Sequence, residues 1–240
     1  MTATEVSDAT GRITLRRRRG RRRQVILIAA VAAALALLGG LAWLLLGSDV
    51  LGVRAVEVHG NRLVATADVQ RVAEIGAGTP LARVDLDGAA TRVSGLPPVA
   101  KVAVARQWPN TISIEITERT PALAIETPGG YWIADDAGVV FDSAAQAPRG
   151  VLTARVPSGD PRLVRDLASV VQALPPGVRG KVRLITAATP DSITLELDDG
   201  VRVIWGSAGQ SELKAQILTR LMAAKHRVYD VSAPSSPTTR

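Results

Sequence analysis

The sequence has no cysteine and only two histidines, His59 and His226. Without thiols the chain can form neither a disulfide nor a thiolate nucleophile nor a cysteine zinc site. Both histidines fall where we expect surface turns or strand starts, which leaves few candidates for a histidine metal site or a Ser-His-Asp triad. Aromatic residues are scarce as well, at 3%. The stability of the fold must therefore come from the packing of aliphatic side chains.

Sequence motifs of catalysis and nucleotide binding are also missing. There is no G-x-S-x-G, no P-loop and no dinucleotide fingerprint. The acidic pairs Asp135–Asp136 and Asp198–Asp199 fall at expected hairpin tips, where aspartate favours turn geometry and where chain neighbours do not converge on one substrate. Asp85 and Asp87 are better explained as a helix cap than as metal ligands. The sequence predicts no catalytic residue, no metal site and no cofactor.

Acidic residues are too few to balance the charge at the start of the chain. The net charge is +7 over 240 residues, and residues 1–24 contribute +6 of it through eight arginines. This basic tail has no aromatic residue to stack on bases and no periodic helix to enter a groove, which argues against nucleic-acid binding. It is typical of a signal for membrane topology that also attracts anionic lipid headgroups.

Residues 25–46 form an uncharged apolar run after the arginines. A helix of this length reaches roughly 33 Å, enough to cross a hydrocarbon core of about 30 Å. A cleaved signal peptide is the alternative, but its apolar region is usually shorter and ends in a small-x-small site, which is not found here. We expect a transmembrane helix with the N-terminus in the cytoplasm and the rest of the chain across the membrane.

The region 52–125 predicts a small α+β domain with the order strand, helix, helix, strand, strand. Val56 and Val58 alternate in the first strand, and the two helices follow in 66–75 and after Asp85. The last two strands lie on either side of Trp108-Pro109-Asn110, since proline cannot donate to a ladder and Pro-Asn favours a turn. Such a unit makes a three-stranded sheet with a helical layer on one face.

The segment VAKVAVARQWPNTISIEITERTPALA resembles the FtsQ/DivIB family of bacterial cell division proteins, and the preceding element order resembles a POTRA (polypeptide-transport-associated) domain. The resemblance covers about residues 20–232. Glu118 and Arg119 are interpreted as a surface or interdomain salt bridge rather than a partner-binding pair, and Trp108 as a core or hinge residue. The residues that match the family pattern are Arg106, Trp108, Pro109, Thr111, Ile112, Ile114, Ile116, Glu118, Arg119 and Pro121.

The region 126–232 predicts a second domain that is mixed and mainly antiparallel, with helices. Hairpins are expected at 135–138 and 198–200, and a helix begins at Pro161 with Asp160 as its N-cap. A second helix, in 211–224, is expected to stack Leu213, Ile217 and Leu221 at i, i+4 spacing. Residues 233–240 are polar and rich in proline, which predicts a disordered tail.

A short strand before that tail is the candidate binding site. We expect it at a sheet edge, with unpaired main-chain groups that another chain's strand can bind. The family resemblance implies that FtsB/DivIC-like and FtsL-like division proteins bind here. The residues to which it assigns the site are Val228, Tyr229, Asp230, Val231 and Ser232.

Two functions from different classes fit these features. The first is a non-catalytic, single-pass scaffold in the plasma membrane at the division septum, which links division proteins to septal wall synthesis and takes no small-molecule substrate. The second is an extracytoplasmic cell-wall enzyme on the same anchor, which would need converging acid and base residues. An outer-membrane transporter component is a weaker alternative, because no alternating barrel segments follow the POTRA-like unit.

Overall fold

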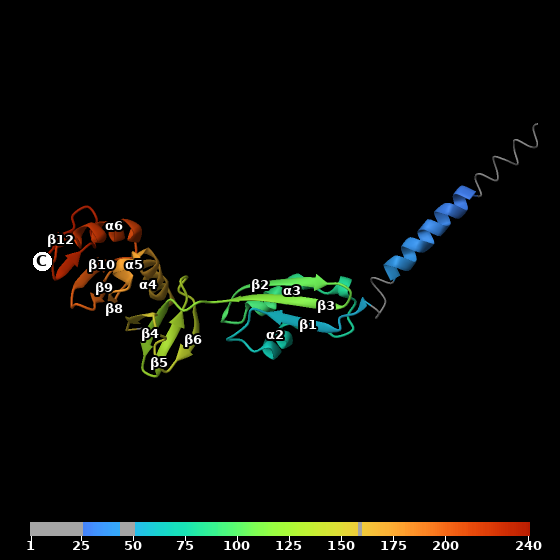
Figure 1. Cartoon of the computed structure of the whole chain (residues 1–240), viewed down its shortest axis with the longest axis horizontal. Coiled ribbons are helices and arrows are strands. Elements are labelled where there is room, and N and C mark those ends of the chain that lie inside the picture. Colours follow the sequence, from blue (N-terminus) through green and yellow to red (C-terminus); the bar gives the residue numbers. More distant parts are fainter. Residues whose placement is uncertain (1–25, 44–50, 158–159) are drawn as a thin grey trace, which may run out of the picture.

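The computed structural model describes residues 26–43, 51–157 and 160–240. An apolar helix, a first domain and a second domain follow one another along the long axis (Figure 1). The helix Ile26–Trp43 has a mean hydropathy of 2.4 and is long and apolar enough to cross a membrane. It lies within the expected span 25–46, whereas the basic tail 1–24 lies outside the described residues.

The first domain has the expected element order. Strand β1 (Ala55–His59) is followed by helix α2 (Thr66–Ala73), the short 3-10 helix η2 (Leu81–Arg83) and helix α3 (Leu86–Ser94), and then by β2 (Val99–Gln107) and β3 (Thr111–Glu118). The sheet order is β1-β3-β2, with β1 parallel and β2 antiparallel to β3. The Trp108–Pro109 peptide, which is cis, lies in the β2–β3 turn as expected.

The core of the first domain lies between this sheet and its helices. The three isoleucines of β3, at 112, 114 and 116, are at most 3% exposed, and they pack with Val69 of α2 and Val93 of α3. Helix α3 begins at Asp85, whose side chain accepts the Gly88 amide at 3.0 Å. The alternating pattern of β3 therefore points its apolar face at the helices.

The second domain begins earlier than the predicted boundary at residue 126. Strand β4 (Leu123–Thr127) pairs with strands of the second sheet and packs in the second core. The first sheet ends at Glu118, so the domains join between 118 and 123. The predicted boundary is too late because only a short segment, which includes Pro121 and Ala122, separates β3 from β4.

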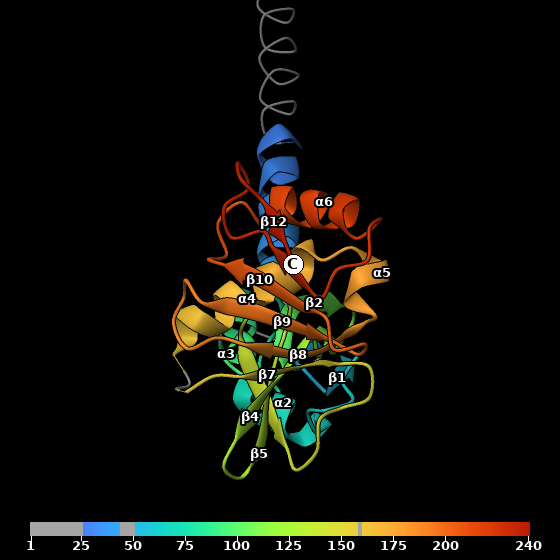
Figure 2. The same cartoon turned by 90° about the vertical axis from the view of Figure 1, so that its left-hand side faces the viewer.

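Over residues 122–157 and 160–240, the second domain is one sheet of nine strands with three helices. Figure 2 looks along the long axis and shows these strands in order from β12 to β5. The order is β12-β11-β10-β9-β8-β7-β4-β5-β6, with five antiparallel and three parallel pairs. The further elements are β5 (Gly130–Ala134), β6 (Val140–Ala144), β7 (Leu152–Arg155), α4 (Pro161–Ala173), α5 (Pro176–Arg179), β8 (Val182–Thr186), β9 (Ile193–Leu197), β10 (Arg202–Gly206), α6 (Ser211–Leu221), β11 (Val228–Asp230) and β12 (Thr238–Thr239).

Helices α4 and α6 both begin where the sequence predicts them. Asp160 caps α4 by accepting the Arg162 amide at 2.9 Å. In α6, Leu213 is 44% exposed, whereas Ile217 and Leu221 are partly buried against the second core. Lys214 is buried, because its ammonium group bonds main-chain oxygens below the helix, and this turns the buried face by about one residue.

Candidate functional site

Strand β11 holds the centre of the predicted binding site. It runs parallel to β10, with Val228 opposite Arg202 and Tyr229 opposite Val203. The Val231 amide donates to the main-chain oxygen of Ile204 at 3.0 Å and extends this pairing. The prediction of a strand at this position is therefore correct.

The prediction that this strand forms the sheet edge is wrong. Strand β12 pairs antiparallel with β11, with Thr239 opposite Tyr229 and Thr238 opposite Asp230. The amide of Val228 donates to the main-chain oxygen of Arg240 and the amide of Arg240 donates back, both at 3.0 Å. Residues 233–240 thus fold back on the site, and the expected disordered tail is not observed. Main-chain pairing compensates for the tail's lack of apolar side chains.

The five predicted site residues divide into a buried and an accessible set. Tyr229 is 3% exposed and Val231 is fully buried, so both belong to the core. The Tyr229 hydroxyl donates to the main-chain oxygen of Ala224 at 2.7 Å. Val228 and Asp230 are half-buried and Ser232 is exposed. Side chains that can meet a partner therefore come from alternate positions, as the period of a strand requires.

Val228 and Asp230 lie on the sheet face opposite the buried Tyr229. Their register neighbours Arg202 and Ile204 on β10 share that face.

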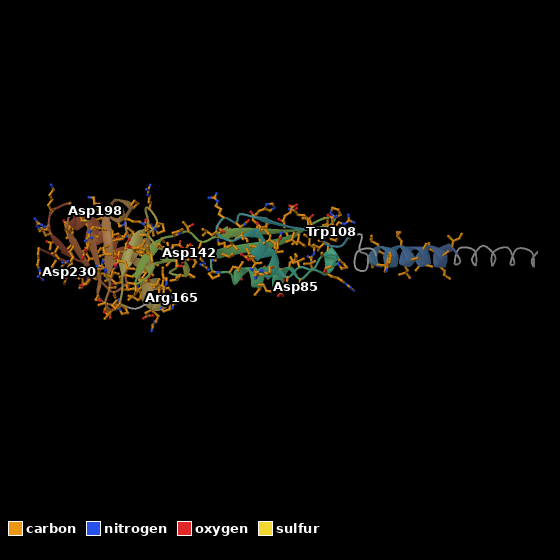
Figure 3. All side chains as sticks on the ribbon, turned by 90° about the horizontal axis from the view of Figure 1, so that it is seen from below. Asp85, Trp108, Asp142, Arg165, Asp198 and Asp230 are labelled. Atoms are coloured by element: carbon orange, nitrogen blue, oxygen red, sulfur yellow. The ribbon has the colours of Figure 1, made fainter. Side chains whose placement is uncertain are left out.

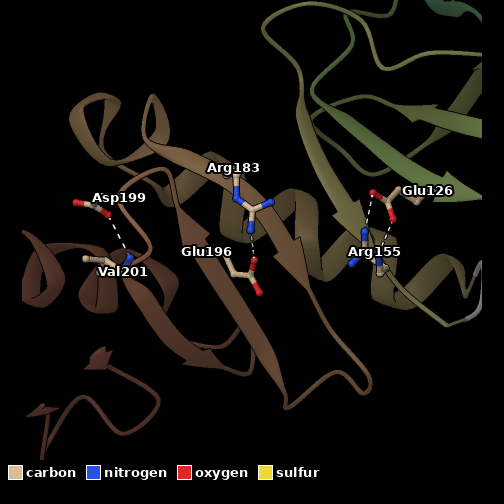
Figure 4. Close-up of polar contacts among 6 residues, drawn as sticks. All are labelled: Glu126, Arg155, Arg183, Glu196, Asp199 and Val201. Carbon is tan, nitrogen blue, oxygen red and sulfur yellow. Dashed lines mark hydrogen bonds and ion pairs between the residues drawn. The ribbon is translucent and has the colours of Figure 1, made fainter. Parts of the chain in front are cut away.

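Farther along the sheet, two ion pairs cross between neighbouring strands (Figure 4). Arg183 pairs with Glu196, and Arg155 with Glu126, each with a nitrogen–oxygen distance of 2.5 Å. These exposed pairs keep the strands soluble and contribute little stability.

Lys214 of helix α6 binds the main chain at the end of strand β10. Its Nζ donates to the main-chain oxygens of Trp205 at 3.0 Å and of Ser207 at 2.7 Å, while the Trp205 indole donates to the Ser211 hydroxyl at 3.1 Å. Burial lowers the pKa of Lys214, and the charge of Asp191 opposes that shift. Nothing in the sequence signals this role, because lysine on an amphipathic helix usually faces water.

The family-motif residues Arg106 and Trp108 have different surroundings. The Arg106 guanidinium donates to the main-chain oxygens of Leu81 and Val84, each at 2.7 Å, and holds the η2 segment against β2. Trp108 is 52% exposed at the turn, so the prediction of core or hinge packing is wrong. The turn lies at the end of the β2–β3 hairpin, and the described residues leave half of the Trp108 surface open to solvent.

Glu118 fixes the loop that follows β1. One of its carboxylate oxygens, Oε1, accepts the amides of Arg62 and Leu63 at 2.8 Å and of Val64 at 3.0 Å. Burial acts to raise the pKa of Glu118, but the three backbone donors outweigh it and hold the pKa below its usual 4.5. Glu118 therefore has a structural role within the first domain.

Arg119 connects the two domains. Its Nη1 lies 2.5 Å from Oδ2 of Asp135, and its Nε donates to the main-chain oxygen of Pro97 at 3.1 Å. Asp135 is 4% exposed, and its other oxygen accepts the amides of Ala137 and Val139. The salt bridge expected for Glu118 and Arg119 is therefore half correct: Arg119 forms one across the domains with Asp135, whereas Glu118 binds backbone amides instead. Asp135 serves the turn as predicted, although it is buried rather than exposed.

The remaining acidic candidates serve local structure. Asp199 accepts the Val201 amide at 3.2 Å in the β9–β10 turn, while Asp198 and Asp136 are exposed beside their turns. Asp87 lies in the first turn of α3, next to the cap. Among the described residues, no three His, Asp or Glu side chains come together as metal ligands.

Comparisons with known proteins cover nearly all of the chain beyond the apolar helix. Residues 51–119 match the model of the FtsQ-type POTRA domain, and residues 122–232 match the C-terminal model of the cell division proteins FtsQ/DivIB. These two ranges meet where the first sheet ends and β4 is about to begin.

Curated relatives match most of the chain. The cell division protein FtsQ of Streptomyces collinus is 40% identical over 217 residues, covering 84% of this chain and 82% of its own length. FtsQ of Streptomyces bingchenggensis is 40% identical over 215 residues, covering 84% and 81%. FtsQ of Mycolicibacterium smegmatis is 36% identical over 202 residues, covering 83% of this chain and 60% of its own length.

A solved extracytoplasmic domain of DivIB from Geobacillus stearothermophilus is also similar, at 16% identity and a TM-score of 0.36. It aligns with 45% of this chain and 91% of its own. The two family models and the 40% identical relatives are decisive: the chain belongs to the FtsQ/DivIB family of cell division proteins, a family of division scaffolds rather than enzymes, and its apolar helix supports a single-pass membrane protein.

Proposed function

We propose that this chain is a non-catalytic scaffold of the division machinery that recruits FtsB/DivIC-like and FtsL-like proteins to septal wall synthesis. Its N-terminus lies in the cytoplasm, the apolar helix crosses the plasma membrane, and both folded domains lie on the extracytoplasmic side. The arginine run supports this orientation through the positive-inside rule. Recruitment occurs by strand addition at Val228–Ser232, the residues around β11.

One observation carries the recruitment proposal: the sheet ends in a strand of only two residues. Strand β12 contributes Thr238 and Thr239, whose side chains add no apolar cluster to the core. Its pairing consists of main-chain hydrogen bonds, each of which contributes only about 1 kcal/mol net. We infer that a longer partner strand takes the place of β12, because it would make the same bonds and further ones along 228–232.

The main chain of β11 is oriented for such an exchange. The Arg202 amide donates to the main-chain oxygen of Arg227, and the Val231 amide donates to that of Ile204. The main-chain groups of Val228 and Asp230, which lie between them, therefore point away from β10. Those of Val228 bond Arg240 of the tail. A partner strand that bonds Val228 and Asp230 leaves the pairing with β10 intact.

The test is capture of co-expressed partner proteins from membranes by the full chain. Asp230→Pro removes one outward amide without altering the β10 ladder, so we expect at least a tenfold loss of capture. Asp230→Ala keeps the amide and should retain capture, and both variants should melt near the wild-type temperature. Deletion of residues 233–240 should increase capture. Normal capture by Asp230→Pro, or loss after the deletion, would refute strand exchange.

The enzyme alternative makes a separate prediction. A membrane-anchored extracytoplasmic cell-wall enzyme would release soluble fragments from purified peptidoglycan, whereas a scaffold would not. Protease treatment of intact protoplasts tests the orientation: both domains should be digested while the N-terminal tail is protected. Digestion of the tail alone would reverse the proposed topology.

A further inference from the structure

The end of the first domain nearest the apolar helix is built from three segments, which we call the hairpin tip: residues 51–54, 78–83 and 106–110. The Arg54 amide donates to the main-chain oxygen of Asn110 at 2.8 Å, and the Val53 amide to that of Thr79 at 2.9 Å. Arg106 joins the third segment to Leu81 at 2.7 Å. The hairpin tip is therefore one rigid surface rather than three independent loops.

The exposed groups of the hairpin tip are aromatic and cationic. Trp108 is 52% exposed, and Pro109 next to it is exposed as well. Arg54 and Arg83 are also exposed, while the three segments contain no aspartate and no glutamate. Glu74 and Asp85, outside the three segments, line one pocket with Arg83. An exposed indole on a surface that also carries exposed arginines matches the chemistry of an anionic lipid headgroup region.

The covalent chain keeps the hairpin tip close to the bilayer. Arg54 follows Trp43, the last described residue of the apolar helix, by only 11 residues. Even fully extended, such a segment spans no more than roughly 40 Å. Figure 3 shows Trp108 at the end of the first domain that faces the helix, and Asp198 and Asp230 at the opposite end of the molecule. The membrane surface is therefore always present at high effective concentration.

We propose that the hairpin tip is a lipid-binding surface, with Trp108 at headgroup depth and Arg54 and Arg83 bound to the phosphates of anionic lipids. The leaflet is the one from which the folded domains emerge. Tryptophan favours this interfacial depth because its ring is apolar and its N–H is polar. Each arginine near an anionic surface contributes about a fivefold gain in association. The contact fixes the first domain on the membrane and holds β11 and β12 away from it.

The test uses full-length protein in nanodiscs and exploits the absence of cysteine. A fluorophore is attached at Gln107→Cys in the hairpin tip, or at Leu63→Cys, an exposed control in the loop fixed by Glu118. Quenching by nitroxide-headgroup lipids is then measured in phosphatidylglycerol and in phosphatidylcholine discs. We expect strong quenching at 107 in phosphatidylglycerol, at least twofold weaker quenching in phosphatidylcholine, and little at 63 in either.

Variants separate binding from mere tethering. Arg54→Glu with Arg83→Glu, and separately Trp108→Ser, leave the tether unchanged and alter only exposed side chains, so the domain should stay folded. Each should reduce quenching at 107 by at least half. If quenching at 107 is the same in both lipids and is unchanged by these substitutions, the proposal is wrong and the tether alone places the tip near the membrane. If the label at 107 is not quenched in the discs, and a crosslinker at the same position captures a protein in native membranes, the hairpin tip contacts a protein rather than lipid and the proposal is wrong.

Discussion

Replacing Glu118 with alanine should destabilise the first domain more than the loss of one half-buried side chain suggests. Its single oxygen Oε1 holds three consecutive amides, of Arg62, Leu63 and Val64. Water can replace the carboxylate at the first two, which are exposed. The Val64 amide is half-buried, and the Val64 side chain, at 8% exposure, packs in the core. We estimate a loss of about 2 kcal/mol in the free energy of unfolding.

For a domain of this size such a loss corresponds to a fall in melting temperature of roughly 8–16 °C. Circular dichroism of the full chain in detergent at pH 7 measures it. Glu115→Ala is the matched control, because Glu115 lies on the same strand with an exposed side chain. The control should melt within a few degrees of the wild type.

The stability difference between wild type and Glu118→Ala must also depend on pH. The lowered pKa of Glu118 determines whether that difference grows or shrinks in acid. A carboxylate with a lower pKa in the folded state stabilises the fold above its unfolded pKa and loses that contribution as the pH falls through the folded value. The difference between wild type and Glu118→Ala should therefore be largest above about pH 4.5 and shrink in stronger acid. A wild-type melting temperature for Glu118→Ala at pH 7, or a difference that grows in acid, would refute the role assigned to this carboxylate.

Two further predictions concern buried charges of the second domain. Lys214→Met leaves the main-chain oxygens of Trp205 and Ser207 without their donor and should cost about 2 kcal/mol at pH 7 in urea melts. Because the folded-state pKa of Lys214 is lowered, wild-type stability should rise as the pH approaches 10.5, and this rise should be absent from the variant. Asp135→Asn keeps an oxygen for the turn but weakens the pair with Arg119, so spin-label distances between the domains should broaden while each domain's melting temperature falls by only a few degrees. An unchanged distance distribution would show that this pair does not fix the domain arrangement.

Most of the fold could be predicted from local sequence pattern. The alternation of Ile112, Ile114 and Ile116 predicted β3, and the Asp85 and Asp160 caps predicted where α3 and α4 begin. Pro109 and Asn110 predicted the turn between β2 and β3. These features are decided by neighbouring residues, because strand period, helix capping and proline geometry act over a few positions of the chain.

The site was harder to predict, because it depends on segments far apart in the sequence. A polar, proline-rich tail gave no local signal for β12, since two threonines become a strand only where β11 offers free main-chain groups. The inward turn of Lys214 likewise required the main-chain oxygens at 205 and 207 to lie beneath α6.

The sequence by itself determined the apolar helix, the order of elements in the first domain and the family of this protein. Only the tertiary structure decided that Trp108 is exposed on a cationic tip and that β11 is covered by the chain's own tail. Sequence pattern encodes which face of an element is apolar. Which segment covers an apolar face or a sheet edge depends on the tertiary packing of residues far away in the sequence.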